Sequence, residues 1–302
     1  MDRFDAIQTL LAAVDGGSLS AASRKLGMPL PTVSQKVSKL EAHLGAQLLV
    51  RTNRKLLLTE AGSAFVSAGR RLLEDLDNAE RAAAGEYQTP RGELLVTASI
   101  MFGKLYVTPI VLAFLAAHPQ VNVRVVLADH VIDLVENHVD VAIRIGRLPD
   151  SGLVAARVGS IHWVICASPA YLAAHGVPTE PEDLEQHQCI GFEGLQTYRI
   201  WPFGRDAGAR SIAIRPRFSA NTADAVIEAA VAGVGIARLT SYQAASAIRD
   251  GKLVSLLRNH APEPLPVHLV HTGPPLLPLK MRSFIDFAIP RLRTSLAKIE
   301  NI

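Results

Sequence analysis

Residues 26–45, LGMPLPTVSQKVSKLEAHLG, constrain the fold of this chain more than any other stretch. At the 100° per residue of an α-helix, their apolar positions form one narrow stripe, which predicts a helix with that stripe in a core. Pro29 and Pro31 fix the chain where the helix begins, because proline suits the first helical position, and Gly45 ends it. The stripe consists of Val33, Val37, Leu40 and Leu44.

The opposite face of this predicted helix carries short polar and amide side chains. A surface helix usually carries Glu/Lys pairs there, whereas Ser, Thr and Gln have little reason to be in a helix unless they contact something. Gln and Thr suit base edges in a major groove, and Lys suits phosphate. A DNA-recognition helix is therefore our interpretation, and a three-helix bundle with a solvated face is the alternative. The residues on this face are Thr32, Gln35, Ser38 and Lys39.

Shorter elements are predicted on both sides of this helix. Residues 2–15 place apolar side chains on one helical face, a Gly-Gly pair ends that helix, and Ser18 suits the N-cap of the segment LSAASRKL. After Gly45, AQLLVRTNRKLLLTEAG predicts a two-stranded ribbon with a basic tip, and Thr59 suits the N-cap of the next helix. Cations at such a tip lie along a phosphate backbone or in a minor groove, which indicates a wing. The face of the first helix consists of Phe4, Ile7, Leu11 and Val14.

The excess positive charge is confined to the N-terminal fifth of the chain. Residues 1–62 hold eight Lys/Arg against five Asp/Glu, which accounts for the whole formal charge of +3 and predicts a polyanion partner for that part alone. A length of 302 residues predicts two or three domains. We find no basic and apolar leader and no apolar run of about 18 residues, so we expect a cytoplasmic protein without a membrane partner.

A longer helix is predicted over residues 60–84, which hold no proline. Its small and apolar residues alternate spacings of four and three, as in the seam of a coiled coil. We expect the seam to serve dimerisation, which would present two recognition helices to half-sites about 34 Å or a multiple of that apart. The alternative is a helix packed on the C-terminal domain of its own chain. YQTPRG, residues 87–92, then acts as a hinge. The seam residues are Phe65, Gly69, Leu72, Leu76, Ala79 and Ala83.

The remaining two hundred residues alternate predicted strands and helices. ELLVTAS, VNVRVVLAD, DVAIRIG and HWVICAS are strands, and TPIVLAFLAAHP and VIDLVEN are helical. Over residues 161–266 follow the strands CIGF, SIAIRPRFSA, GIARL and KLVSLL and the helix TADAVIEAAVAG. VHLVH and a helix over residues 280–296 complete the set. This order predicts an α/β domain with a largely parallel sheet.

Several fixed spacings in the first sixty residues resemble the N-terminal signature of LysR-type transcriptional regulators. Family members often carry Ser-Gln before the proline and Arg after the serine, where this chain has Pro29-Leu30 and Gln35. The family's usual base contacts are therefore not carried over at those positions. The matching residues are Ala21-Ala22, Val33-Ser34, Leu40-Glu41, Leu44-Gly45, Leu48-Leu49, Arg51, Arg54, Leu58-Thr59 and Ala61-Gly62.

The resemblance implies an N-terminal all-α winged helix-turn-helix, a linker helix, and an α/β two-lobed effector domain similar to periplasmic binding proteins. The expected bounds are 1–59 for the DNA-binding domain, 60–89 for the dimerisation helix and hinge, and 90–302 for the effector-binding domain. Lobe one would comprise 91–161 plus 267–302, and lobe two 162–266. The implied partners are double-stranded promoter DNA, a small-molecule effector and further copies in a homodimer or homotetramer, while contact with RNA polymerase is left open.

Two sets of site residues are predicted. Ligands in open α/β sheets bind beyond the carboxyl ends of strands, where hydroxyl and free N–H groups favour an anionic effector and large apolar side chains favour an aromatic body. The alternative is that these residues cap helices and pack the core. The effector-binding set is Ser99, Met101, Phe102, Ala128, Ile145, Gly146, Trp201, Asn221 and Thr222. The DNA-binding set is Ser18, Pro31, Thr32, Ser34, Gln35, Ser38, Lys39, Arg51, Arg54 and Lys55.

We find no catalytic or metal-binding constellation in the sequence. GVGIAR lacks the third glycine of a dinucleotide loop, GxSxG, HExxH and GxxxxGK[ST] do not occur, and the ten histidines are scattered. We expect no enzyme activity, metal or cofactor. A redox sensor using Cys166 or Cys189 is an alternative, although Cys166 lies inside an apolar strand. A stand-alone small-molecule binding protein is another, but it leaves the basic N-terminal part without a role.

Overall fold

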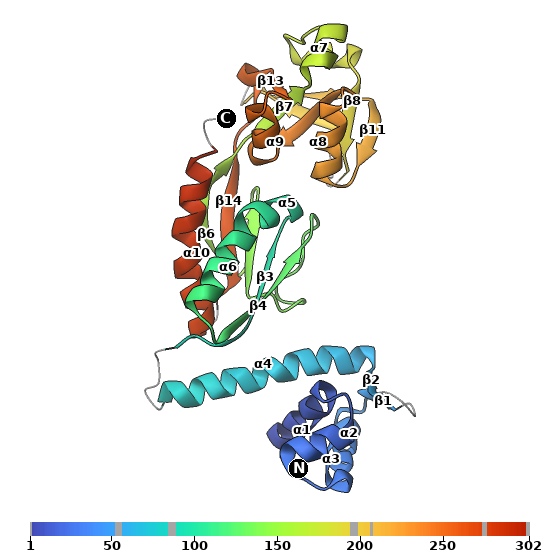
Figure 1. The fold of residues 1–302 in the computed structure, drawn as a ribbon, viewed down its shortest axis with the longest axis vertical. Coiled ribbons are helices and arrows are strands. Elements are labelled where there is room, and N and C mark those ends of the chain that lie inside the picture. The colour runs from blue at the N-terminus through green and yellow to red at the C-terminus, as the bar shows by residue number, and fades with distance from the viewer. Residues whose placement is uncertain are drawn as a thin grey trace. The chain divides into compact units, whose positions relative to one another are not determined.

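The structure is a computed structural model, and it describes residues 2–51, 56–83, 89–193, 199–205, 208–273 and 277–299. The chain forms two compact units, Met1–Gln88 and Thr89–Ile302, and each is described by itself (Figure 1).

The N-terminal unit contains the predicted helices and the predicted ribbon. The strands of the ribbon pair antiparallel, with Leu49 opposite Leu58 and Arg51 opposite Leu56. This confirms the winged helix-turn-helix. The elements are α1 (Arg3–Asp15), α2 (Leu19–Leu26), α3 (Leu30–Leu44), β1 (Leu49–Arg51), β2 (Leu56–Leu58) and α4 (Glu60–Ala83).

The core of this unit is built on the apolar stripe of α3. Val33, Val37 and Leu40 are buried as predicted. Leu44 was expected with them but is 39% exposed, and it is the last residue of α3. Phe4 on α1 is likewise exposed, and it lies in the first turn of its helix.

Two contacts fix the ribbon and α4 against the helices. The carboxylate of Glu41 on α3 accepts hydrogen bonds from the N–H groups of Leu48 and Leu49, at 2.8 and 3.0 Å. Thr59 is the N-cap of α4 as predicted: its hydroxyl accepts from the Gly62 N–H at 2.9 Å. The orientation of the wing therefore depends on side chains of both flanking helices.

The second unit consists of two α/β lobes, each built on a five-stranded sheet. Lobe one has the strand order β4-β3-β5-β14-β6, and lobe two has the order β11-β8-β12-β7-β13. The elements of lobe one are β3 (Gly92–Ala98), α5 (Ile100–Phe102), η1 (Gly103–Val107), α6 (Thr108–Ala117), β4 (Val121–Leu127), β5 (Val141–Ile145), β6 (Leu153–Ile161), β14 (Leu265–Thr272) and α10 (Leu279–Ala297). The elements of lobe two are β7 (Trp163–Ala167), α7 (Pro169–His175), η2 (Pro181–Gln186), β8 (Cys189–Phe192), β9 (Ile200–Phe203), β10 (Arg210–Ala213), β11 (Pro216–Ala220), α8 (Ala223–Val231), β12 (Ile236–Thr240), α9 (Ser241–Arg249), β13 (Val254–Leu256) and η4 (Arg258–His260).

Each sheet is largely parallel and contains one described strand that runs against the other four. In lobe one this strand is β14, which pairs antiparallel with β5 and β6. In lobe two it is β7, which pairs antiparallel with β12 and β13. The chain leaves lobe one after β6 and enters lobe two at β7, and it returns at β14. The two reversed strands are thus the ones that follow the crossings between lobes.

Helices α6 and α10 cover one face of the lobe-one sheet, where Phe114 and Phe284 pack edge to face with ring centroids 5.2 Å apart. The helical stretch Ile100–Ala117 is long and apolar enough to cross a membrane by length and composition. Its side chains Phe102, Ile110 and Phe114 are instead part of this core.

Two expected elements of the second unit differ from the structure. VIDLVEN forms turns instead of a helix, because the Asp133 carboxylate accepts from the Val135 and Glu136 N–H groups, each at 2.8 Å, and so holds the backbone in a local turn. SIAIRPRFSA forms two strands instead of one: β10 pairs with β9 and β11 pairs with β8.

Candidate functional site

The exposed face of α3 carries three of the predicted DNA-binding residues. Because Val33, Val37 and Leu40 are buried, Gln35, Ser38 and Lys39 face outward and are exposed. The side chains of Gln35 and Lys39 make no hydrogen bond or ion pair to any residue that the structure describes. They are therefore available to a partner.

The other residues of the DNA-binding set differ in their positions, and some lie outside the residues that the structure describes. Ser18 is the N-cap of α2, where its hydroxyl accepts from the Ala21 N–H at 3.1 Å. Pro31 is exposed and occupies the second position of α3 instead of the predicted first, because the helix begins at Leu30. Thr32 and Ser34 are half-buried on α3, and Arg51 contributes its backbone to β1. The side chain of Arg51 and the whole of Arg54 and Lys55 lie outside the described residues.

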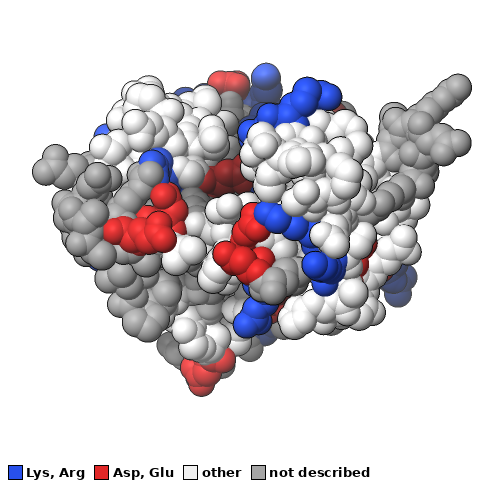
Figure 2. Space-filling model, turned by 90° about the horizontal axis from the view of Figure 1, so that it is seen from below, with Lys and Arg blue, Asp and Glu red and all other residues white. Residues whose placement is uncertain are grey.

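Several basic side chains of the N-terminal unit are already paired with acids. Lys36 on α3 contacts Asp5 at 2.5 Å, and Asp15 contacts both Arg70 and, at 4.0 Å, Lys25. Figure 2 shows a face of the molecule on which Lys and Arg groups are interspersed with Asp and Glu groups. Among the described cations of this unit, Lys36, Arg70 and Lys25 are thus partly neutralised by Asp5 and Asp15, whereas Lys39 has no acidic partner among the described residues.

Helix α4 carries exposed apolar side chains along the predicted seam. Val66 is buried and Leu73 is partly buried against the core of the N-terminal unit, whereas Leu72 and Leu76 are 47% and 37% exposed. Of the other predicted seam residues, Phe65 and Gly69 pack within the unit. The side chains of Ala79 and Ala83 lie outside the described residues.

A cavity of about 330 Å³ lies between the two lobes of the second unit. The hydroxyls of Ser99, from lobe one, and Thr240, from lobe two, are both buried there, and both interact with the hydroxyl of Tyr242. The cavity therefore brings buried hydroxyl groups of both lobes together. The lining residues are Ser99, Ala128, Asp129, His130, Val131, Ile143, Arg144, Ile145, Gly146, Trp163, Phe192, Thr240, Tyr242, Gln243 and Leu265.

Charged and polar groups of the cavity are held by local contacts. Asp129 accepts from the Ile100 N–H at 3.0 Å, so its carboxylate lies at the start of the helical stretch that follows β3. Arg144 donates to the Ile132 carbonyl, and burial lowers its pKa. Burial also raises the pKa of the Tyr242 hydroxyl, which keeps it a neutral donor at physiological pH. Gln243 accepts from the Thr240 N–H at 2.9 Å in a capping box at the start of α9.

The structure brings four of the nine predicted effector residues to this cavity and places the other five elsewhere. Ser99, Ala128, Ile145 and Gly146 line it. Phe102 is fully buried beside it, with its ring centroid 5.0 Å from that of Tyr106 and 5.3 Å from that of Tyr242.

Met101 packs against the cores of both lobes. Trp201, on β9, is buried in a core cluster of lobe two. Asn221 is exposed and Thr222 half-buried at the start of α8, and neither lines the cavity.

Five lining residues that sequence reasoning missed come from lobe two: Trp163, Phe192, Thr240, Tyr242 and Gln243. Phe192 and Thr240 end the parallel strands β8 and β12, so the rule of strand carboxyl ends could have found them. Trp163 begins β7, and because β7 runs in reverse, its first residue lies at the same edge of the sheet. Only knowledge of the strand direction would have identified it.

Both cysteines are fully buried free thiols, and burial raises the pKa of each to about 12. A thiol with such a pKa is protonated and unreactive at neutral pH, so neither cysteine has the properties of a redox sensor. The described residues also contain no group of three or more His, Cys, Asp or Glu side chains suited to a metal ion.

Both units match families of known proteins. Residues 4–63 match the family described as bacterial regulatory helix-turn-helix protein, lysR family, and residues 87–293 match the LysR substrate binding domain. The chain belongs to the LysR family of transcriptional regulators.

This LysR-type regulator is 32% identical over 291 residues to the transcriptional regulator CrgA of Neisseria meningitidis, which covers 96% of this chain and 97% of the relative. It is 30% identical over 286 residues to the transcriptional activator AaeR of Escherichia coli, covering 95% and 93%. The solved structure of CrgA has a TM-score of 0.61 and 31% identity over 95% of this chain and 98% of that one. Full-length AphB, a virulence activator of Vibrio cholerae, has a TM-score of 0.60 and 29% identity over 96% and 99%.

Proposed function

We propose that this LysR-type regulator binds promoter DNA in the cytoplasm through α3 and the wing, and that a small anionic or aromatic metabolite in the interlobe cavity controls it. The observation that supports effector control is the pair of buried hydroxyls, Ser99 and Thr240, that different lobes contribute to one cavity. A ligand that accepts hydrogen bonds from both would link the two lobes.

The lining residues favour an amphipathic ligand. Trp163, Phe192 and Tyr242 give the cavity aromatic walls, which suit a ring or another flat apolar body. The hydroxyls of Ser99 and Tyr242 can donate to a carboxylate or carbonyl oxygen. A volume of about 330 Å³ limits the ligand to a small metabolite.

Ligand binding would act by favouring one arrangement of the lobes. A ligand that bonds to both lobes is bound more tightly when they are close, so it shifts the population toward that arrangement. Regulation then requires only that DNA-competent and DNA-incompetent states bind the ligand with different affinity.

The effector half of this proposal is tested with a thermal-shift screen of small carboxylates and neutral aromatic compounds, followed by calorimetric titration of each hit. Ser99→Ala and Tyr242→Phe should each weaken binding of a hit about 2- to 12-fold, the effect of one ordinary hydrogen bond. Tyr106→Phe is the matched control, because Tyr106 lies in the same aromatic cluster but does not line the cavity. A hit whose affinity none of the three variants changes would place effector binding outside this cavity.

The DNA half is tested on α3 with footprinting of the promoter beside the gene and with gel-shift titrations. Gln35→Ala should lower affinity for the operator and leave affinity for unrelated DNA unchanged, because an amide reads base edges. Lys39→Ala should weaken both and reduce the slope of log affinity against log salt by about 0.9 per lost phosphate contact. His43→Ala, an exposed residue at the end of the same helix, is the control. Unchanged sequence preference in Gln35→Ala would remove that residue from the interface.

A further inference from the structure

Lobe two contains a buried arginine without a counter-charge. Arg238 on β12 is 4% exposed, and its Cζ lies 4.7 Å from the ring centroid of Trp163 and 5.8 Å from that of Trp201. Its Nη1 donates to the Ile200 carbonyl at 3.4 Å, whereas its Nε is buried without a hydrogen-bond partner. Among the described residues, no carboxylate lies within ion-pair distance of it.

Such an arrangement is uncommon, because a buried charge is normally paired with an opposite charge. Burial lowers the pKa of Arg238 to about 10, which still leaves the guanidinium charged at neutral pH. Stacking on two indole rings stabilises the cation but supplies no hydrogen-bond acceptor. An anion is therefore the group that this side chain lacks.

A cavity of about 410 Å³ opens beside this guanidinium. Its basic lining residues are Arg205, Arg238, Arg258 and His162, and no Asp or Glu occurs among the lining residues that the structure describes. Trp163, Phe203, Leu256 and several prolines supply the apolar part of the wall. This combination favours a ligand with one negative group and an apolar body.

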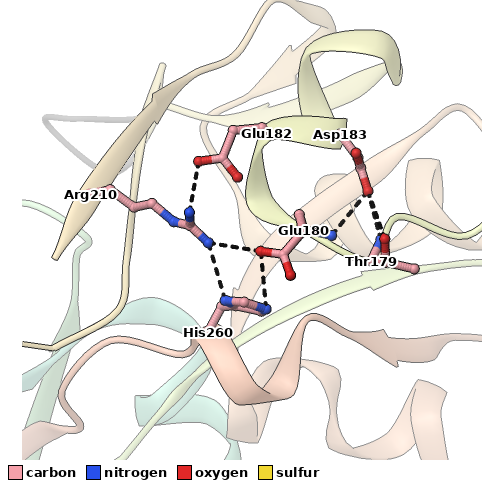
Figure 3. A network of polar contacts seen from close by, with 6 residues as sticks. All are labelled: Thr179, Glu180, Glu182, Asp183, Arg210 and His260. Carbon is pink, nitrogen blue, oxygen red and sulfur yellow. Dashed lines mark hydrogen bonds and ion pairs between the residues drawn. The ribbon is translucent and has the colours of Figure 1, made fainter. Parts of the chain in front are cut away.

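Polar contacts hold one wall of this cavity in place. The wall includes residues 257–264, and within it the His260 carbonyl accepts from the Gly204 N–H at 2.8 Å. Figure 3 shows Arg210 paired with Glu180 and Glu182, each at 3.0 Å, and contacting the His260 imidazole at 3.3 Å. A wall fixed in this way lowers the ordering cost of binding.

The cavity is distinct from the one between the lobes. Only Trp163 lines both, so its ring is a shared wall. Arg205 contacts Glu263 at 3.4 Å and is exposed, which leaves Arg238 as the buried cation of this cavity without an acidic partner among the described residues.

We propose that the Arg238 cavity is a second ligand site, which takes a small monocarboxylate with an apolar body. The carboxylate would accept hydrogen bonds from the guanidinium, as Arg and carboxylate commonly pair, and the apolar body would lie along Trp163 and Leu256. Because Trp163 also borders the interlobe cavity, an occupant here would change the wall that the effector contacts.

The two tryptophans of the chain both lie within 6 Å of Arg238, so intrinsic fluorescence reports directly on this cavity. The probe is cyclohexanecarboxylate, which does not absorb at tryptophan wavelengths, and the neutral comparison is cyclohexanecarboxamide. We expect a saturable change in the emission of the full-length wild-type protein with the carboxylate and at least about tenfold weaker binding of the amide. This comparison needs no variant.

Variants then locate the site. Arg238→Leu should abolish the response, and Arg238→Lys should retain it with about tenfold lower affinity, because lysine keeps the charge but not the planar fork. Arg217→Ala, at an exposed arginine of lobe two outside the cavity lining, and Ser99→Ala are the matched controls and should change the affinity less than about twofold. Circular dichroism confirms folding of each variant.

Three results would overturn the proposal. One is equal binding of carboxylate and amide. Another is a response that survives in folded Arg238→Leu or disappears in Ser99→Ala, which would assign the probe to the interlobe cavity. The third is the absence of a saturable response to cyclohexanecarboxylate or butanoate up to about 20 mM. This concentration range includes the dissociation constants expected even for weakly binding ligands of this size. None of these results would contradict effector binding between the lobes.

Discussion

Gly62 determines how closely α4 can approach the wing. A Cβ at this position would lie 2.0 Å from the Leu48 carbonyl oxygen, a backbone atom that cannot move without shifting β1. We expect Gly62→Ala to destabilise the N-terminal unit by about 1–3 kcal/mol, the usual cost of overpacking, and to weaken operator binding with it. Gly152→Ala is the control, because its Cβ would meet open space at an ordinary backbone conformation. Thermal unfolding and gel shifts measure both, and a wild-type melting temperature for Gly62→Ala would contradict the close approach.

Cys166 and Cys189 are predicted to be inert in the folded protein. Burial raises the pKa of each from 9.0 to about 12, so the thiolate fraction at pH 8 is about a thousandfold lower than for a free thiol. Iodoacetamide should therefore modify neither cysteine in the native protein and both in urea, as mass spectrometry would show. Because burial raises the pKa of both thiols in the folded state, the stability that depends on their staying protonated is fully present below pH 9. That contribution is lost as the pH rises toward 12. Rapid native labelling, or DNA binding that peroxide alters and Cys166→Ser restores, would reopen redox sensing.

At the scale of elements, α4 has two apolar faces with different roles. Leu73 faces the core of its own unit, whereas Leu72 and Leu76 are exposed one turn apart on another face. We expect Leu72→Asp to convert the oligomer toward monomer in light scattering, because a charge would have to be buried between paired helices. Leu73→Ala should lower stability instead and leave the oligomeric state unchanged. Ser67→Asp, also exposed on α4, controls for added charge. A Leu72→Asp protein with wild-type mass would mean that this face does not pair.

Strand order explains which parts of the fold and of the interlobe cavity could be predicted from the sequence. Periodicity predicts the helices and most strands because each depends on local spacing, and strand ends then predict Ser99 and Ile145 correctly as neighbours. Asn221 also follows a strand, but β11 is the edge strand of its sheet and its end lies apart from the cavity. Sheet order and strand direction arise from long-range pairing, which no local pattern records. For the same reason Trp163 was missed, and Trp201 was expected at the cavity although its side chain on β9 is buried in the core of lobe two.

For the whole molecule, one chain joins a helix-turn-helix unit, in which α3 exposes polar side chains, to a unit that contains cavities. Neither property alone produces regulation. Regulation requires a coupling free energy between effector binding and DNA binding: the effector must bind with a different affinity when operator DNA is bound. The operator affinity then changes by the same factor when the effector is bound.

This reciprocity gives a prediction that does not require the effector's chemistry to be known in advance. For any hit from the thermal-shift screen, the factor by which it changes operator affinity should equal the factor by which the operator changes affinity for the hit, with a value typically between about 5 and 150. Fluorescence anisotropy of a labelled operator, with and without saturating hit, gives the first factor, and calorimetry of the hit, with and without operator, gives the second.

An unrelated DNA fragment of equal length is the control and should give a factor near one in both experiments. Ser99→Ala should weaken the hit in both states, so that more of it is needed for the same effect on DNA. A hit that changes operator affinity while the operator leaves its own affinity unchanged would show that it acts on something other than this protein.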